Sequence, residues 1–230
     1  MKKNTYYTAV GNLRTKRDAE GRCYPVIVIN QKEYPVDLQE MMVWSTLCWR
    51  LCNEKELSVR YEELAVDLPY ERRTLECCVS RLMTRGLVAR GEGDAQFEAL
   101  YNLLCDLYVV PVCERLSFRV AAFLSLVLRD GVSVRKASAI FHEDRRDDWE
   151  TRVMKLAGQA VLSTAELIKC VEVGATDVST DKKLLDALYI DPDTTCDNIG
   201  LLMSTAKNRE PVTVAIANLY LRKQIILERV

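Results

Sequence analysis

The stretch that decides the fold is residues 57–93, LSVRYEELAVDLPYERRTLECCVSRLMTRGLVARGEG. It predicts a helix from about residue 60 to residue 67, which ends before Pro69 because proline lacks the amide hydrogen that a helix interior requires. A further helix is expected at about residues 71–85. The stretch therefore has the order of a helix, a proline-containing turn and a second helix.

The second of these helices has a clear apolar side. Three aliphatic residues recur at helical spacing and are expected to face inward: Leu75, Val79 and Leu82. Gly86 suits the position after a helix, where glycine adopts a left-handed conformation at little cost. Residues 87–90 are then expected to form a strand, and residues 91–94 a tight turn.

The residues before this stretch predict a small antiparallel sheet followed by a helix. Three segments are rich in β-branched and aromatic residues: 6–10, 24–29 and 33–36. Asp37 then suits a helix N-cap, with Glu40 three residues later as in a capping box. A helix is expected at residues 38–52.

Beyond Asp94 the pattern is helical almost throughout. The expected helices are 95–108, 114–129, 133–141, a long one at 146–173, 180–189, 195–206 and 211–229. No internal repeat of fixed period is seen. The expected fold is mainly α with a small antiparallel sheet, divided into a winged helix-turn-helix domain at residues 1–94 and an all-α dimerisation or regulatory domain at residues 95–230.

Residues 57–93 resemble the winged helix-turn-helix of bacterial transcription regulators. The closest match is RLMTRGLV at residues 81–88, with YEELA at residues 61–65 resembling the helix before the turn. The resemblance implies that residues 71–85 form a recognition helix. The sequence departs from the family pattern after Gly93, where a helix is expected instead of a returning strand, so the wing is expected to be truncated or replaced.

A helix of this kind fits the major groove of DNA, where side chains contact base edges. The residues expected on its outward or flanking sides, as contacts to bases, are Arg72, Arg73, Glu76, Cys77, Ser80, Arg81 and Thr84. The residues expected to contact phosphates, which fix the register of the protein on the duplex, are Arg60, Tyr61, Tyr70, Arg85 and Arg90.

Charge and cysteine usage set further bounds. Residues 1–93 carry 15 Lys and Arg against 13 Asp and Glu, and the remaining residues carry 17 against 20, so the positive balance lies on the amino-terminal side. The nine cysteines include no CxxC pair, and His142 is the single histidine. This pattern predicts reduced thiols, no metal site and no cofactor. No apolar run is long enough to cross a bilayer, and a cytoplasmic location is expected.

Two functions remain open from the sequence. The first is a sequence-specific DNA-binding transcriptional regulator that binds double-stranded DNA as a homodimer paired through its carboxy-terminal helices. The second is a protein-interaction adaptor that uses the winged helix as a docking module. A protein or small-molecule effector is left open as a further partner. An enzyme is not expected, because no residues at catalytic spacing are seen.

Overall fold

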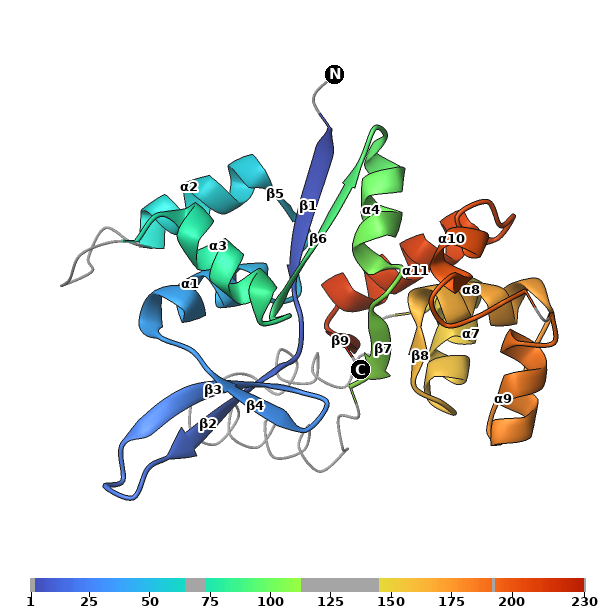
Figure 1. Cartoon of the computed structure of the whole chain (residues 1–230), viewed down its shortest axis with the longest axis horizontal. Coiled ribbons are helices and arrows are strands. Elements are labelled where there is room, and N and C mark those ends of the chain that lie inside the picture. The colour runs from blue at the N-terminus through green and yellow to red at the C-terminus, as the bar shows by residue number, and fades with distance from the viewer. Residues whose placement is uncertain (1–2, 65–72, 113–144, 192, 230) are drawn as a thin grey trace, which may run out of the picture.

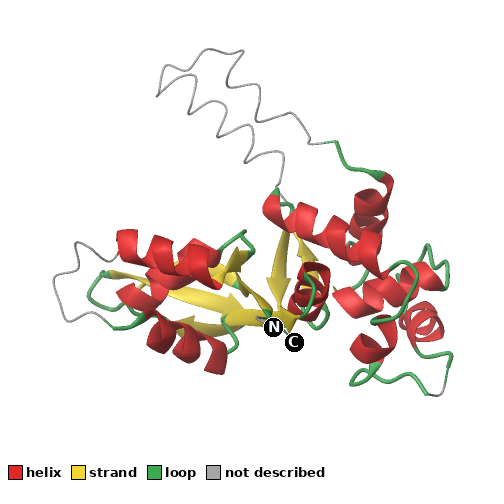
Figure 2. Ribbon diagram, turned by 90° about the horizontal axis from the view of Figure 1, so that it is seen from above, coloured by secondary structure: helices red, strands yellow, loops and turns green. Residues whose placement is uncertain are grey.

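The computed structural model of the chain describes residues 3–64, 73–112, 145–191 and 193–229. It shows a mixed α/β protein with helices and three small antiparallel sheets (Figures 1 and 2). In chain order, the described elements are β1 (Asn4–Ala9), β2 (Asn12–Arg17), β3 (Cys23–Ile29), β4 (Lys32–Pro35), α1 (Leu38–Leu47), β5 (Cys52–Asn53), α2 (Glu54–Leu64), α3 (Leu75–Thr84), β6 (Val88–Gly93), α4 (Gln96–Leu104), β7 (Tyr108–Pro111), α7 (Asp148–Ala157), β8 (Leu162–Ser163), α8 (Thr164–Glu172), α9 (Asp181–Leu188), α10 (Ile199–Met203), α11 (Arg209–Leu221) and β9 (Ile225–Glu228).

The first half of the molecule, from β1 to β6, is built on the sheet β5–β1–β6. Its central strand β1 pairs antiparallel with β6 along its whole length and with the short strand β5 at Tyr6 and Tyr7. These strands run between α1–α3 on one side and α4 on the other (Figure 1). Helix α4 packs closely because β6 carries glycine there: a Cβ on Gly91 would lie 2.3 Å from the backbone nitrogen of Leu103.

A second sheet, β2–β3–β4, projects from the first half and leads into α1. The two residues between β3 and β4, Asn30 and Gln31, have φ angles of 45° and 64°, as a two-residue hairpin turn of type I′ requires. Asp37 then caps α1 by accepting a hydrogen bond from the Glu40 amide, and the Glu40 carboxylate accepts from the Asp37 amide. The expected capping box is confirmed.

Among the described elements, those of the second half, from β7 to β9, follow the order of β1, α1, β5, α2, α3 and β6 in the first. Strand β7 is the centre of the sheet β8–β7–β9, as β1 is of β5–β1–β6. In each half a helix (α1 or α7) precedes a two-residue strand that runs directly into the next helix (α2 or α8), and a last helix (α3 or α11) leads into the closing strand. The second half adds α9 and α10 before its last helix.

The repeat extends to single residues. Asp147 and Glu150 form the same reciprocal capping box at α7 that Asp37 and Glu40 form at α1. In both halves a polar residue 16 positions after this cap closes a second capping box, Asn53 with Glu56 and Ser163 with Glu166. By these shared caps, α7 is the equivalent of α1 and α8 is the equivalent of α2, and equivalent residues are 110 positions apart.

The closing helices align in the same way, 137 positions apart. Arg85 and Arg222 are their C-cap residues, and each is followed by a residue of positive φ, Gly86 at 72° and Lys223 at 61°. Each helix ends with the same backbone bonds, such as the one that the Leu87 amide donates to the carbonyl of Leu82. The sheet register agrees with both offsets. Tyr7 pairs with Cys52 and Arg90, and Val109 pairs with Leu162 and Leu227, which lie 110 and 137 positions after them.

The two halves share one hydrophobic core, and Tyr220 of α11 lies at their junction. Its buried hydroxyl is 3.0 Å from the hydroxyl of Thr8 and 3.3 Å from the carbonyl of Ala9, and it accepts a hydrogen bond from the Trp49 amide at 2.9 Å. The Gly11 amide also donates to the carbonyl of Leu227. Figures 1 and 2 show α1–α3 at one end of the molecule and α7–α10 at the other, with strands between them.

Several expectations need correction. The second half is not all-α, because β7, β8 and β9 form a sheet. The long helix expected at 146–173 is two helices, since α7 ends at Ala157 and Leu162–Ser163 pairs with β7. Helices expected at 114–129 and 133–141 lie outside the described residues. None of the helices in the described ranges has both the length and the apolarity to cross a membrane.

Candidate functional site

Helix α3, the predicted recognition helix, lies on the surface of the first half with one side in the core. Thr74 caps it by accepting from the Cys77 amide. Val79 and Leu82 are buried as expected, whereas Leu75 is partly exposed and Cys78 is fully buried. The side chains expected to contact bases and found exposed are Glu76, Cys77, Ser80, Arg81 and Thr84. Arg72 and Tyr70 lie outside the described residues.

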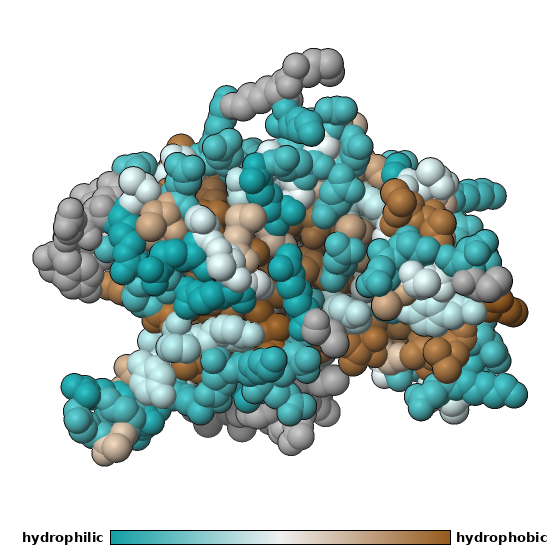
Figure 3. All heavy atoms as spheres, viewed as in Figure 1, coloured by the Kyte–Doolittle hydropathy of each residue, from teal (hydrophilic) through white to brown (hydrophobic). Residues whose placement is uncertain are grey.

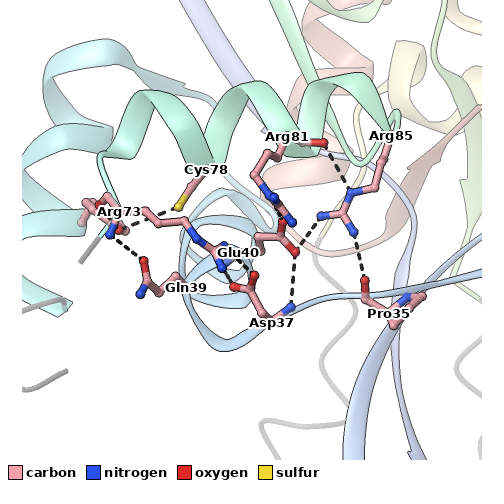
Figure 4. Close-up of polar contacts among 9 residues, drawn as sticks. Pro35, Asp37, Gln39, Glu40, Arg73, Cys78, Arg81 and Arg85 are labelled. Atoms are coloured by element: carbon pink, nitrogen blue, oxygen red, sulfur yellow. Dashed lines mark hydrogen bonds and ion pairs between the residues drawn. The ribbon is translucent and has the colours of Figure 1, made fainter. Parts of the chain in front are cut away.

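The arginines of this segment do not extend freely into solvent but bind the amino terminus of α1 (Figure 4). Arg73 Nη1 lies 2.5 Å from Asp37 Oδ2, and its backbone amide donates to Gln39 Oε1. Arg81 Nε lies 2.7 Å from Glu40 Oε1, and Arg85 Nη2 lies 2.7 Å from Glu40 Oε2. Arg85 also donates to the carbonyl of Pro35. Two carboxylates therefore pair with three guanidinium groups.

Glu40 is the centre of this network, because only 2% of its side chain is exposed. Burial by itself would raise the pKa of the Glu40 carboxyl, but hydrogen bonds from Arg81 and Arg85 outweigh it and hold the pKa below its usual value. At Asp37 burial is again outweighed, by the Glu40 amide and Arg73, and the pKa is lowered. Both carboxylates are thus ionised partners at neutral pH.

The remaining residues expected at phosphate contacts are placed differently from one another. Tyr61 is buried, and its hydroxyl donates to the carbonyl of Arg73, which corrects the expectation that it faces phosphate. Arg85 is partly buried and paired as described. Arg60 is exposed on α2. Arg90 is exposed on β6, forms an ion pair with Glu92, and lies 5.9 Å from the centre of the Tyr7 ring.

A groove of about 540 Å³ runs along α3 on the side away from α1, and it was not predicted from the sequence. Its apolar lining includes Leu57, Val79 and Met83, and its polar lining includes Glu54, Glu76 and Arg90. It is open at the surface between α3, the start of α2, and the strands β1 and β6. The signal available in the sequence was Met83, an apolar residue beside the expected inward face.

In the second half the equivalent surface is covered. Positions 137 residues after Glu76, Val79 and Ser80 are Thr213, Ile216 and Ala217, and all three are buried. Helix α4 packs against α11, where the Arg209 guanidinium stacks on the Phe97 and Tyr101 rings at 4.9 and 5.3 Å. The segment after α4 continues over α8, since the amides of Thr164 and Ala165 donate to the carbonyls of Leu107 and Cys105.

The second half also carries large exposed apolar side chains on α9, α10 and the residues beside them: Leu185, Ile190, Leu201 and Leu202. Figure 3 shows brown patches at that end of the molecule, while hydrophilic atoms predominate over α2 and α3. Among the residues that the structure describes, no three His, Cys, Asp or Glu side chains are grouped as metal ligands would be.

Comparison with known proteins adds no relative to this description. No family model, curated protein or solved structure matches the chain.

Proposed function

We propose that the first half is a protein-docking module whose groove along α3 receives an amphipathic helix of a partner protein. The observation that carries the proposal is internal to the chain: Thr213 and Ala217 of α11 are buried, whereas the equivalent Glu76 and Ser80 of α3 are exposed beside an open groove. Helix-in-groove binding is a common mode of recognition, in which apolar residues at helical spacing enter an apolar channel.

The lining of the groove defines the chemistry of the partner helix. Its apolar floor favours aliphatic or aromatic residues at positions i, i+4 and i+7. Glu54 and Glu76 lie along the groove with Arg90. A partner helix with Lys or Arg facing the two glutamates, and an acidic residue facing Arg90, would match this pattern.

The charge distribution favours this function over DNA binding. Asp37 and Glu40 pair with the three arginines of the α3 segment, which reduces the positive charge available to phosphates. The exposed charges of α2 are four acidic and two basic: Glu54, Glu56, Glu62, Glu63, Lys55 and Arg60. Helix α2 is acidic and lies beside α3, the predicted recognition helix, so it would repel the phosphate backbone of DNA.

A DNA-binding regulator is the second candidate, as the sequence predicted. The element order α1, β5, α2, α3, β6 supports a winged helix in which β1, from the amino-terminal side, takes the place of the strand after the wing. Cys77, Ser80, Arg81 and Thr84 are exposed along one helix, which favours contact with a major groove. Pairing of two copies through the second half, and an effector, remain proposals alongside it.

The docking proposal is tested by selecting a displayed library of amphipathic helical peptides on the full chain. Peptides that are enriched are then measured by fluorescence anisotropy against the chain and two variants. Ser80→Arg places a long side chain in the groove, whereas Cys77→Arg places the same side chain on the same helix at an exposed position that does not line the groove. We expect Ser80→Arg to weaken binding at least about tenfold and Cys77→Arg to leave it unchanged.

DNA binding predicts a different result from the same proteins. Affinity for a selected duplex would fall steeply with salt, and Cys77→Arg would strengthen it by adding a positive charge. Absence of any enriched peptide, or equal loss with both variants, would contradict docking in the groove. Salt-dependent, sequence-specific binding that is lost in Arg81→Ala would establish the DNA-binding function in its place.

A further inference from the structure

A second cavity, of about 500 Å³, lies where the two halves meet. Trp44, Trp49 and Arg50 line it from the first half, and Tyr220, Lys223 and Ile226 line it from the second. Its volume is within the range of sites that hold small molecules. It lies apart from the groove along α3, and no residue lines both.

The backbone around this cavity is strained. Four non-glycine residues in the described ranges have positive φ, and Asn30 and Gln31 are accounted for by their hairpin turn. The other two, Trp49 at 54° and Lys223 at 61°, both line the cavity. Residues other than glycine in this conformation are costly and gather at functional sites.

Lys223 holds a side chain in this conformation, at the position that follows the C-cap of α11. The equivalent residue in the first half is Gly86, which adopts the same conformation without a side chain. Lys223 instead places its ammonium 5.4 Å from the centre of the Trp49 ring. Trp49 is itself held by two hydrogen bonds to the second half, from its amide to the Tyr220 hydroxyl and from its indole N–H to the carbonyl of Ile225.

The lining is aromatic and positively charged. Lys223 and Arg50 both line the cavity, and among the residues that the structure describes no carboxylate side chain lines it. Trp44 is buried at the cavity wall, with its indole N–H bonded to the carbonyl of Val10. Cys48 adds a neutral thiol, because burial raises its pKa to about 11.

We propose that this cavity binds a small planar carboxylic acid, with its ring against Trp49 and its carboxylate at Lys223 and Arg50. Aromatic stacking and charge-assisted hydrogen bonds are the interactions that the lining provides. Because the ligand contacts both halves, its binding strengthens their association. This site is independent of the groove along α3.

The test uses three acids of increasing size, phenylacetate, indole-3-acetate and 1-naphthylacetate, each paired with its amide. Binding to the full chain is measured by isothermal titration calorimetry. We expect at least one acid to bind, at least about tenfold more tightly than its amide, since the amide lacks the charge that Lys223 and Arg50 recognise. Failure of all three acids, or equal affinity for acid and amide, would overturn the proposal.

Variants locate the site. Lys223→Gln and Arg50→Gln should each weaken binding of the acid at least about tenfold. Lys55 is an exposed lysine on α2 away from this cavity, and Lys55→Gln should leave the affinity unchanged. Lys223→Gly should raise the melting temperature of the free chain by relieving the strained backbone, and should remove the preference for acid over amide. Full affinity in both Lys223→Gln and Arg50→Gln would also overturn the proposal.

Discussion

The same helix has opposite surroundings in the two halves of the molecule. Helix α3 has an exposed side with an open groove beside it, whereas its counterpart α11 is buried along most of its length. Helix α4 lies between the halves: it packs on the first sheet at the glycines of β6 and contacts α11 of the second half through Phe97 and Tyr101. One copy of the unit thus has its last helix buried as a structural support, and the other has a free surface beside it.

The largest expected effect on the free energy of unfolding is at Ala217, compared with the equivalent residue Ser80. Ala217→Arg places a charge in a buried position with no partner and should cost about 4 kcal/mol or more of the free energy of unfolding. Ser80→Arg, on the open surface, should change it by less than about 0.5 kcal/mol. Urea denaturation of both variants checks this. Similar losses in the two would show that the first-half surface is not open.

A second comparison concerns the outer face of the first sheet, which α4 covers. Gly91→Ala brings a Cβ within 2.5 Å of backbone atoms of α4 and should cost about 3 kcal/mol. Glu228 is the equivalent residue of β9, and Glu228→Ala should cost less than about 1 kcal/mol. Thermal unfolding followed by circular dichroism measures the difference. A tolerated Gly91→Ala would contradict the close packing of α4.

The capping glutamates provide a third comparison. Glu40 binds two arginines, whereas Glu150 binds Arg222 through Oε2 and leaves Oε1 without a hydrogen-bond partner. Glu40→Gln should therefore cost about 2 kcal/mol, and Glu150→Gln about half as much. Equal losses in denaturant titrations would show that the second arginine adds nothing.

The same network makes stability depend on pH. The pKa of Glu40 is lowered in the folded chain, so its contribution is complete above the ordinary carboxyl pKa and is lost as the pH falls through the lowered value. We expect wild-type stability to decline below about pH 4, and the decline to be shallower in Glu40→Gln. An unchanged slope in that variant would assign acid sensitivity to other carboxylates.

The smallest expected effect comes from giving a partner to Glu150 Oε1 in the second half. Asn218 is the residue equivalent to Arg81, so Asn218→Arg places a second guanidinium near Glu150. We expect a gain of about 1 kcal/mol. The gain should vanish when Glu150→Gln is present in the same chain, and a double-mutant cycle measures this coupling. A gain that persists would show that the arginine acts elsewhere.

Local signals in the sequence predicted much of the first half. The strands near 6–10, 24–29 and 33–36, the capping box at Asp37 and the helix near 71–85 are confirmed, with shifted ends. The two-residue strands β5 and β8 were missed because their pairing depends on partners distant in the chain. The polar strand β2 has no apolar alternation that would identify it.

The repeat and the groove were beyond local reasoning. The offset between equivalent residues is 102 at the central strands, 110 at the first helices and 137 at the last, so no fixed period exists in the sequence. Periodicity placed Arg73 and Arg81 correctly outside the core. It could not show that Asp37 and Glu40 reach them, because those carboxylates come from a helix more than 30 positions earlier.

The hydroxyl of Tyr220 makes the stability of the second half depend on that of the first. It bonds to Thr8 and Trp49, which are separated from it by more than 170 positions, so these bonds form only when both ends of the chain are in place. Such a linkage makes melting cooperative. Heating should give a single calorimetric transition, and Tyr220→Phe should lower its midpoint for both halves together.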